Sequence, residues 1–296
     1  MKVEGWQLTQ RQGLPLEAKV MWSQGAIREW HEQWEGKVYI SFSGGKDSTV
    51  LLDLTRGMYP DVKAVFFDTG LEFPEIRAFV KTFQNVEWIR PKRSFKDIVE
   101  TYGYPIISKE QSQYIRQVRD GQPEQVRRFI ANDKHFSVGN KYRYLVDAPF
   151  KISERCCYHM KKGPAKSFER KSGLHPIVGT MATDSRLRLQ TYLAHGCNAF
   201  DSARPMSLPM GFWKEEDVWA YIHTKNLPYC SIYDIGYKNT GCVFCAFGAH
   251  LQKEPNKFQL LYDTHPKLWR YCMDELGMRE VLEYIKVPTE PRERLL

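Results

Sequence analysis

The sequence predicts an α/β protein with a doubly wound, mostly parallel sheet, a basic helical insertion and a cysteine-rich C-terminal part. Three β-prone runs support this fold class, at residues 38–42, 62–67 and 85–91. Helical patterns separate them, so that strand and helix alternate about every 20–25 residues. Such alternation is typical of parallel strands with helices on both faces.

The first strand ends in Ser43-Gly44-Gly45-Lys46-Asp47-Ser48, and apolar residues at helical spacing follow. A strand, a glycine-rich turn and a helix N-terminus form a phosphate site, because N–H groups and the helix dipole face the anion. The two glycines permit close approach, the serines add donors and the lysine adds a cation. The spacing is not that of a Walker A loop. A plain loop is the alternative.

The second strand ends in Asp68-Thr69-Gly70, and Pro74 suits the first turn of the next helix. Ligands of parallel sheets bind at the carboxyl ends of the strands. Asp68 and the 43–48 loop are therefore expected to face one pocket. A carboxylate there suits ribose, adenine or Mg²⁺ held with phosphates, and a helix-capping aspartate is the alternative.

Composition narrows the class of protein. The chain has 296 residues, a net charge of +8 and seven cysteines. No apolar run approaches the ~20 residues that span a membrane, and residues 1–20 lack the apolar core of a signal peptide. We therefore expect a cytoplasmic protein with no membrane partner, in which paired cysteines serve metal or redox chemistry rather than disulfides.

Residues 92–150 interleave basic and aromatic side chains. Such a pattern can follow a phosphate backbone while stacking bases, and the alternative is a solvated helical insertion whose aromatic residues face the core. The expected divisions are a helical lead-in at 1–36, a nucleotide-binding domain at 37–250 and C-terminal helices at 251–296. The tail from 288 to 296 is expected to be loosely held.

Four stretches in order resemble the phosphoadenosine phosphosulfate (PAPS) reductase family of the ATP pyrophosphatase, or adenine nucleotide α-hydrolase-like, superfamily. They are residues 43–48, 68–75, 179–188 and 213–237. The resemblance implies a Rossmann-like fold that binds an adenylyl nucleotide. In two positions the chain departs from the family pattern: Met181 stands where arginine is common, and Asp184 stands where glutamate is common.

The resemblance also implies roles for individual residues. Lys46, Asp47 and Asp68 would be catalytic. The nucleotide would be bound by Ser43, Gly44, Gly45, Lys46, Asp47, Ser48, Asp68, Thr69, Gly70, Gly179 and Arg188. The family's sulfonucleotide reductases use a cysteine in a Glu-Cys-Gly-x-His-like motif, and this sequence has nothing similar. The intact loop resembles instead members that use ATP itself.

Cys156-Cys157 and Cys242-x-x-Cys245 are the candidate metal ligands. Four thiolates can hold a four-iron, four-sulfur (4Fe–4S) cluster or a tetrahedral zinc ion. The arrangement resembles the cluster pattern of assimilatory adenylylsulfate reductases and related sulfurtransferases. Structural zinc and free redox thiols are the alternatives.

The expected function is an iron–sulfur ATP pyrophosphatase that adenylates an acceptor for sulfur transfer, of the DNA phosphorothioation type. Its expected partners are ATP, Mg²⁺, a nucleic acid acceptor and a sulfur donor protein such as a cysteine desulfurase. One alternative is an adenylyl or phosphoadenylyl sulfate reductase that releases sulfite. Another is a non-catalytic nucleotide-binding or nucleic-acid-binding module with a structural metal. The sequence leaves open whether the protein is a homodimer.

Overall fold

The computed structural model describes residues 2–291, which divide into two compact units. Among the described residues, unit 1 comprises 2–68, 72–90 and 164–240, and unit 2 comprises 69–71, 91–163 and 241–291. This division differs from the one expected at 1–36, 37–250 and 251–296. The helical lead-in belongs to unit 1, and the C-terminal helices share unit 2 with the insertion.

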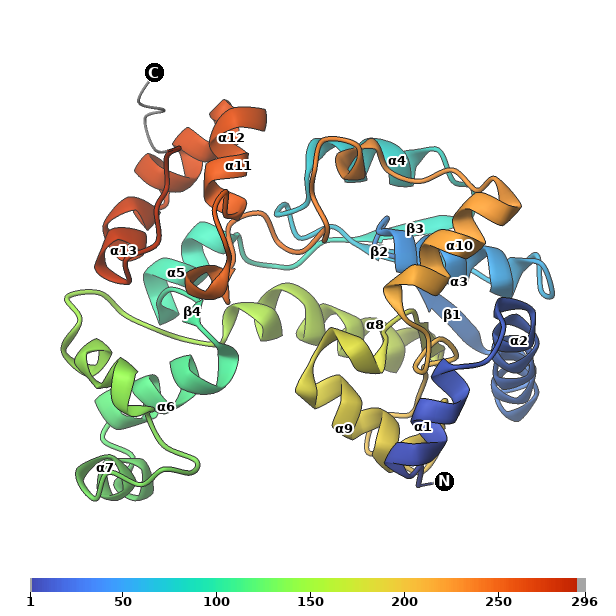
Figure 1. Cartoon of the computed structure of the whole chain (residues 1–296), viewed down its shortest axis with the longest axis horizontal. Coiled ribbons are helices and arrows are strands. Elements are labelled where there is room, and N and C mark those ends of the chain that lie inside the picture. Colours follow the sequence, from blue (N-terminus) through green and yellow to red (C-terminus); the bar gives the residue numbers. More distant parts are fainter. Residues whose placement is uncertain (1, 292–296) are drawn as a thin grey trace. The chain divides into compact units, whose positions relative to one another are not determined.

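Unit 1 contains a six-stranded sheet in the order β3-β2-β1-β5-β7-β6, in which only β6 runs antiparallel to its neighbour (Figure 1). Its strands are β1 (Val38–Ser41), β2 (Ala64–Phe67), β3 (Val86–Ile89), β5 (His175–Val178), β6 (Asn198–Ala199) and β7 (Met206–Ser207). Its helices are α1 (Gly5–Gln12), α2 (Leu16–Gln33), α3 (Lys46–Arg56), α4 (Pro74–Lys81), α8 (Gly163–Ser172), α9 (Arg186–His195) and α10 (Glu215–Lys225), with short turns η3 (Ala182–Asp184) and η4 (Ser231–Tyr233).

Helices cover both faces of this sheet, and side chains of β1 show why. Tyr39 points toward α8, where its hydroxyl donates to Glu169 at 2.8 Å and its ring meets Phe168 edge-on. Val38 pairs in register with His175, whose ring lies beside Trp30 of α2 on the opposite side of the sheet. Apolar strands buried on both faces require such double covering. The predicted fold class is confirmed.

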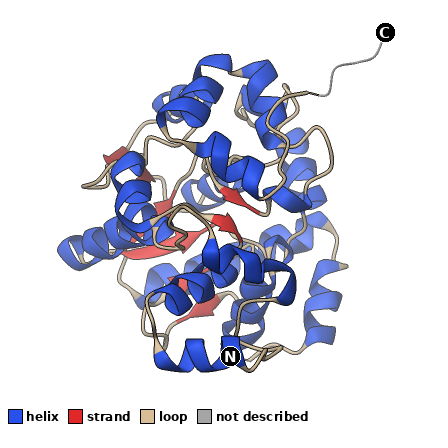
Figure 2. Cartoon of the chain, turned by 90° about the vertical axis from the view of Figure 1, so that its left-hand side faces the viewer, coloured by secondary structure: helices blue, strands red, loops and turns tan. Residues whose placement is uncertain are grey.

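Unit 2 is mainly helical. Figure 2, in which helices are blue, shows that helices predominate over strands in the chain. Its helices are α5 (Phe95–Tyr102), α6 (Lys109–Arg119), α7 (Pro123–Ile130), α11 (Lys257–Thr264), α12 (Pro266–Arg270) and α13 (Met278–Tyr284). Its shorter elements are β4 (Ile106–Ile107), β8 (Ala246–Phe247), the 3-10 turns η1 (Asn140–Asp147) and η5 (Ala249–Leu251), and the π-helical turns η2 (Tyr158–Lys162) and η6 (Tyr271–Glu275). β4 pairs with β8, which joins the insertion to the C-terminal part of the unit.

The tail is better anchored than the sequence predicts. Trp269 donates its indole N–H to the carbonyl of Thr289 at 2.9 Å, and Asn256 donates to the carbonyl of Pro288 at 2.8 Å. Residues 288–290 are therefore held against α11 and α12, contrary to the expectation, whereas 292–296 lie outside the described residues. Among residues 2–291 there is no helix whose length and apolar character would let it cross a bilayer.

Candidate functional site

The predicted phosphate loop, residues 43–48, lies at the point where the strand order of the sheet reverses. The chain leaves β1 toward β2 on one side, and β5 pairs with β1 on the other. In open α/β sheets the crevice at the carboxyl ends of two such strands is the usual ligand site. The loop that follows β1 and the turn that follows β5 flank this crevice.

The loop is shaped by its own serines. The hydroxyl of Ser48 accepts the backbone N–H of Ser43 at 3.1 Å and donates to the carbonyl of Gly45 at 2.9 Å. Gly44 has a φ of +71°, and a Cβ atom there would lie 2.7 Å from a methyl group of Val80. A residue with a side chain would therefore suffer both backbone strain and a clash. The sequence Ser-Gly-Gly is required by this turn.

Lys46 opens α3, and its side chain is only 3% exposed. Its ammonium lies 3.2 Å from a carboxylate oxygen of Glu215 and donates to the carbonyl of Lys238 at 3.3 Å. Burial lowers the pKa of Lys46, but the negative charges of Asp47 and Glu215 outweigh it, so that the pKa is raised overall. The lysine is a permanent cation at a helix N-terminus, where the dipole adds positive potential.

Asp47 carries an unusual carboxylate. Burial, together with the negative charges of Asp184 and Glu215, raises the pKa of Asp47 to about 6, although Lys46 opposes the shift. Its Oδ1 atom is buried and accepts no hydrogen bond, although it lies 3.8 Å from the Lys46 ammonium. A buried acceptor without a donor is costly, and Mg²⁺ is commonly held by one or two carboxylates together with substrate phosphates. The residues present therefore fit a magnesium ion at this position.

The turn after β5 approaches the loop closely. A Cβ atom on Gly179 would lie 3.0 Å from the carbonyl oxygen of Asp47, so only glycine fits without displacing the loop. Arg188 forms an ion pair with Asp184, which also accepts the backbone N–H of Met181 at 2.8 Å. The Met181 side chain is buried, at 3% exposed. Asp184 thus positions Arg188. Met181, which stands where the family often has arginine, packs in the core.

Sequence reasoning missed three residues around the loop. The hydroxyl of Tyr233, in η4, accepts the backbone N–H of Lys46 at 2.9 Å, and Thr240 hydrogen bonds to the same hydroxyl. Glu215 is the third, as the partner of the Lys46 ammonium. Tyr233 and Glu215 fall within residues 213–237, which carried the family resemblance, but no spacing rule marks them individually.

Asp68 lies at the carboxyl end of β2 and is 2% exposed. Its carboxylate accepts hydrogen bonds from Arg77 at 2.9 Å and from Arg90 at 3.2 Å, so two guanidinium groups compensate its buried charge. Thr69 and Gly70 belong to unit 2, where the carbonyl of the next residue, Leu71, accepts the N–H of Val243. The structure therefore assigns the predicted 68–70 stretch to two units.

The four predicted cysteine ligands lie together in unit 2. Cys156, Cys157, Cys242 and Cys245 line one cavity, with apolar walls from Leu71, Phe95, Pro105 and Met160. The sulfur atoms of the adjacent cysteines are 3.9 Å apart. Cys157 directly precedes the π-helical turn η2, a type of turn that is frequent at functional sites. The sequence thus grouped four cysteines from two distant segments that do line one cavity, and their role as metal ligands stays a prediction.

Basic side chains surround these thiols. A hydrogen bond from Cys156 and the positive charges of Lys109 and Lys161 lower the pKa of Cys157 to about 6, against the effect of burial. Behind the Cys-x-x-Cys turn, the ammonium of Lys257 donates to the carbonyl of Cys242 at 3.0 Å and to that of Cys245 at 2.7 Å. Lys257 was not recognised from the sequence, because its distance from Cys245 matches no known motif.

The four thiols are a donor set that suits an iron–sulfur cluster or a zinc ion. No group of three or more histidine, cysteine or acidic side chains in residues 2–291 has the geometry to hold one metal ion. Four thiols around one cavity match the Cys₄ ligation of a 4Fe–4S cluster, in which each thiolate binds a different iron. The cavity measures about 20 Å³, room for about one water molecule. The thiol side chains would therefore have to turn outward to hold a cluster.

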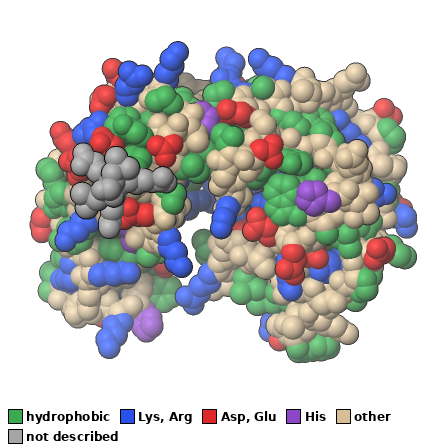
Figure 3. All heavy atoms as spheres, turned by 45° about the horizontal axis from the view of Figure 1, so that its top comes forward, with side chains coloured by type: hydrophobic (Ala, Val, Ile, Leu, Met, Phe, Trp, Pro, Cys, Tyr) green, Lys and Arg blue, Asp and Glu red, His purple; other side chains and the backbone are tan. Residues whose placement is uncertain are grey.

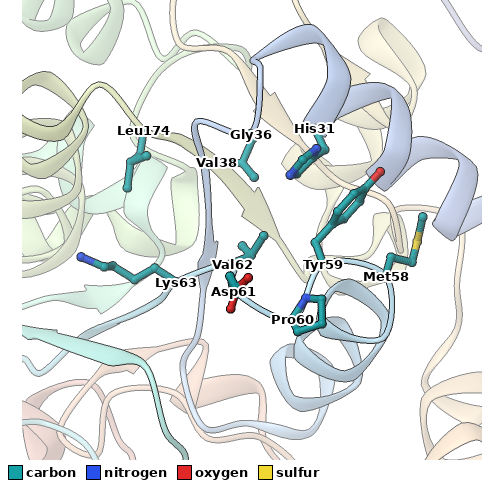
Figure 4. A pocket seen from close by; sticks show the side chains of 10 residues that line it. All are labelled: His31, Gly36, Val38, Met58, Tyr59, Pro60, Asp61, Val62, Lys63 and Leu174. Atoms are coloured by element: carbon teal, nitrogen blue, oxygen red, sulfur yellow. The ribbon is translucent and has the colours of Figure 1, made fainter.

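A larger cavity of about 510 Å³ opens at the opposite ends of the strands. It is lined by residues that precede β1, β2 and β5, among them Gly36, Lys63 and Leu174 (Figure 4). His31 and Tyr59 lie stacked beside it, with ring centroids 3.7 Å apart. Since the phosphate loop follows the carboxyl ends of the strands, this cavity is separate from the candidate nucleotide site.

The sequence pattern of the phosphoadenosine phosphosulfate reductase domain matches residues 37–120 and 129–247. The chain belongs to this family. The match spans both units and includes the loop at 43–48 and all four cysteines of the cavity. The resemblance stated from the sequence is thereby confirmed.

Individual proteins resemble the chain over most of its length. An uncharacterized protein of Methanocaldococcus jannaschii is 30% identical over 257 residues, which cover 83% of this chain and 42% of that protein. The chain thus spans less than half the length of this relative. An adenosine 5′-phosphosulfate reductase of Staphylococcus epidermidis is 27% identical over 221 residues, 74% of each chain. A phosphoadenylyl-sulfate reductase structure from Candida auris covers 82% of this chain and 97% of its own, at 17% identity and a TM-score of 0.45.

Proposed function

We propose that this PAPS reductase family member binds ATP with Mg²⁺ on residues 43–48 and cleaves it between the α- and β-phosphates. An acceptor atom would attack the α-phosphorus, the bond to the bridging oxygen would break, and pyrophosphate would leave. The observation that carries the proposal is the loop itself. It places a helix N-terminus, a buried lysine and a carboxylate oxygen that accepts no hydrogen bond at the crevice of a parallel sheet.

Each of these groups suits a role in that reaction. The N–H groups at the start of α3 and the ammonium of Lys46 would stabilise the negative charge that develops on the leaving pyrophosphate. The Oδ1 atom of Asp47 would hold Mg²⁺ against the phosphates. Arg188, positioned by Asp184, would add a further cation beside the loop.

The second half of the proposal is sulfur transfer to the adenylated acceptor, with AMP as the leaving group. Cys156, Cys157, Cys242 and Cys245 would hold a 4Fe–4S cluster. Such a cluster supplies electrons or a labile sulfide when bound. The sulfur itself would come from a donor protein such as a cysteine desulfurase.

Sulfonucleotide reduction is the second candidate, and the relatives named adenosine 5′-phosphosulfate reductase favour it. A reductase of this family would attack the sulfonucleotide with a cysteine thiolate. None of the seven cysteines in these 296 residues stands in a Glu-Cys-Gly-x-His-like sequence. The ATP-dependent reaction needs no such thiol, and we place it first because of the geometry of the 43–48 loop.

One experiment separates the two. The protein is purified without oxygen and incubated in parallel with ATP·Mg²⁺ and with adenosine 5′-phosphosulfate plus a thiol reductant, and both pyrophosphate and sulfite are measured. Pyrophosphate release from ATP that is lost in Lys46→Ala supports the proposal. Sulfite formation without pyrophosphate release would replace it with the reductase, and nucleotide binding without either product would indicate a non-catalytic module.

A further inference from the structure

The positive charge of the chain is concentrated in one segment. Residues 91–163 contain 15 lysines and arginines against eight acidic residues, so they contribute seven of the eight net positive charges. Over the face drawn in Figure 3, however, basic side chains are interspersed with acidic ones. Net charge therefore indicates a polyanionic partner without locating its surface.

Most arginines of this segment are already bound within unit 2. Arg116 pairs with Glu154 at 2.9 Å, and Arg128 pairs with Glu124 at 2.7 Å. Others donate to backbone carbonyls, as Arg143 does to Phe129 at 2.7 Å. The further arginines that are engaged in this way are Arg119 and Arg127. The alternating pattern of residues 92–150 thus overstates the number of cations that a ligand could use.

Two exposed lysines of this segment lie in and just after the loop between α7 and η1. Lys134 and Lys141 are exposed, and neither forms an ion pair within the part of the chain that the structure describes. They lie on neighbouring segments, because Arg143 of η1 donates to the carbonyl of Phe129, in the last turn of α7, and to Asn132, just beyond that helix. These lysines can neutralise phosphates without first breaking an internal pair.

An aromatic ring stands between these lysines in sequence and points outward. Phe136 is 67% exposed and has a φ of +53°, a conformation that is unfavourable for a bulky residue. The next residues anchor the loop: Val138 is buried, and Gln111 of α6 accepts the N–H of Gly139 at 2.8 Å. The fold thus holds a phenylalanine in a strained, solvent-facing position, which is a pattern typical of functional sites.

Further contacts hold aromatic rings at the surface, where a flat ligand could stack on them. The guanidinium of Arg128 lies 5.7 Å from the Phe136 ring centroid, and Tyr144, 45% exposed, stacks on Tyr284 at 5.7 Å. Base faces are accessible to such rings only in unpaired strands. We infer that Lys134, Phe136, Lys141 and Tyr144, termed the 134–144 surface, bind single-stranded nucleic acid. That this strand is the acceptor of adenylation rests on the proposed function, whereas the binding itself does not.

The test is fluorescence anisotropy of the full chain with labelled single-stranded DNA and single-stranded RNA of one sequence, and with the corresponding duplexes. We expect single strands to bind more tightly than duplexes, with an affinity that falls as salt rises. The DNA and RNA arms identify which strand is preferred. No binding at low salt, or equal binding of the duplex, would overturn the inference.

Matched variants locate the surface. Phe136→Ala should weaken binding roughly 5- to 150-fold, the range for one stacked base. The double variant Lys134→Gln/Lys141→Gln should lower the slope of log K against log salt by about 1.4, because each phosphate contact contributes about 0.7. The control Lys171→Gln/Lys225→Gln removes the same charge from exposed positions of unit 1. A control that weakens binding as much as the surface variant would reduce the effect to net charge and refute the assignment.

The two proposals fail separately. Pyrophosphate release in the absence of nucleic acid should be unchanged in Phe136→Ala, because this residue belongs to unit 2 and the phosphate loop to unit 1. A protein that binds single strands but never cleaves ATP would refute the proposed function and leave the surface in place. A protein that cleaves ATP and binds no strand would do the reverse.

Discussion

Residues 43–48 come from one continuous segment, whereas the four cysteines of unit 2 come from two segments 84 residues apart. In the loop, the partners of the functional groups are side chains: Glu215 meets the Lys46 ammonium and Tyr233 meets its N–H. At the cysteine cavity, the contact is to the backbone instead, because Lys257 donates to the carbonyls of Cys242 and Cys245. The comparison indicates that the loop is held by side chains remote in sequence, whereas the Cys-x-x-Cys turn is held by a lysine 12–15 residues further along the chain.

The largest expected effect comes from removing the thiols of the Cys-x-x-Cys turn. Cys242→Ser/Cys245→Ser should abolish bound iron and visible absorbance in protein purified without oxygen, because a 4Fe–4S cluster needs four thiolates. Pyrophosphate release from ATP should persist, since the loop belongs to the other unit. Cys230→Ala, which removes a buried cysteine of unit 1, is the control and should keep the iron. Iron that remains in the double variant would show that these cysteines are not its ligands.

Lys46→Ala tests the other region. It should lower the rate of pyrophosphate release about 100- to 1,000-fold, the typical loss when one group that stabilises developing charge is removed. Iron content should not change. Lys214→Ala, at a half-buried lysine whose ammonium pairs with Glu216, should behave as the unaltered protein. A Lys46→Ala protein with full activity would mean that the nucleotide binds elsewhere.

The pH dependence of pyrophosphate release should report Asp47. Its pKa is raised to about 6, so the carboxylate that would hold Mg²⁺ is ionised above this value and becomes protonated below it. The rate should therefore fall about tenfold for each pH unit below 6. Asp47→Asn should be slower at pH 8 and should lack this inflection, as measured over pH 5–8 with Mg²⁺ in excess. An inflection that survives in Asp47→Asn belongs to another group.

The smallest effect is expected from Lys257→Met, which keeps the length of the side chain but removes both bonds to the Cys-x-x-Cys carbonyls. Each bond to a charged group contributes about 1.5–3 kcal/mol, and part of this is recovered by water. We expect iron to be lost a few-fold faster to a chelator, with ATP cleavage unchanged. Lys257→Arg should be intermediate. Lys253→Met, at an exposed position nearby, controls for charge.

The sequence predicted features that depend on residues close together in the chain. Ser-Gly-Gly-Lys-Asp-Ser between a strand and a helix defines its own turn, and the parallel β1, β2 and β3 follow from their spacing. Cysteine side chains have few roles, so their four positions could be grouped across 84 residues. The roles assigned to the individual site residues stay predictions.

Other features depended on contacts that no local pattern records. Tyr233, Glu215 and Lys257 are ordinary residue types, and only the fold brings them to the sites. Arg116 and Arg119 could not be recognised as internally bound, because their partners Glu154 and the carbonyls of Ala148 and Phe150 lie 29–38 residues away. The tail at 288–290 was misjudged for the same reason, since its anchors Asn256 and Trp269 are remote in sequence.

The Tyr233 hydroxyl gives the phosphate loop a resting state. It accepts the Lys46 N–H that an anion would otherwise use, so ligand and tyrosine compete for one donor. The apparent dissociation constant of a nucleotide is then its intrinsic value divided by the fraction of molecules in which the tyrosine has left. If about one molecule in ten is open, affinity is about tenfold weaker. Free phosphate makes few contacts and would displace the tyrosine poorly. A triphosphate makes more contacts and can displace it. The tyrosine would therefore lower the affinity of the loop for small anions more than its affinity for ATP.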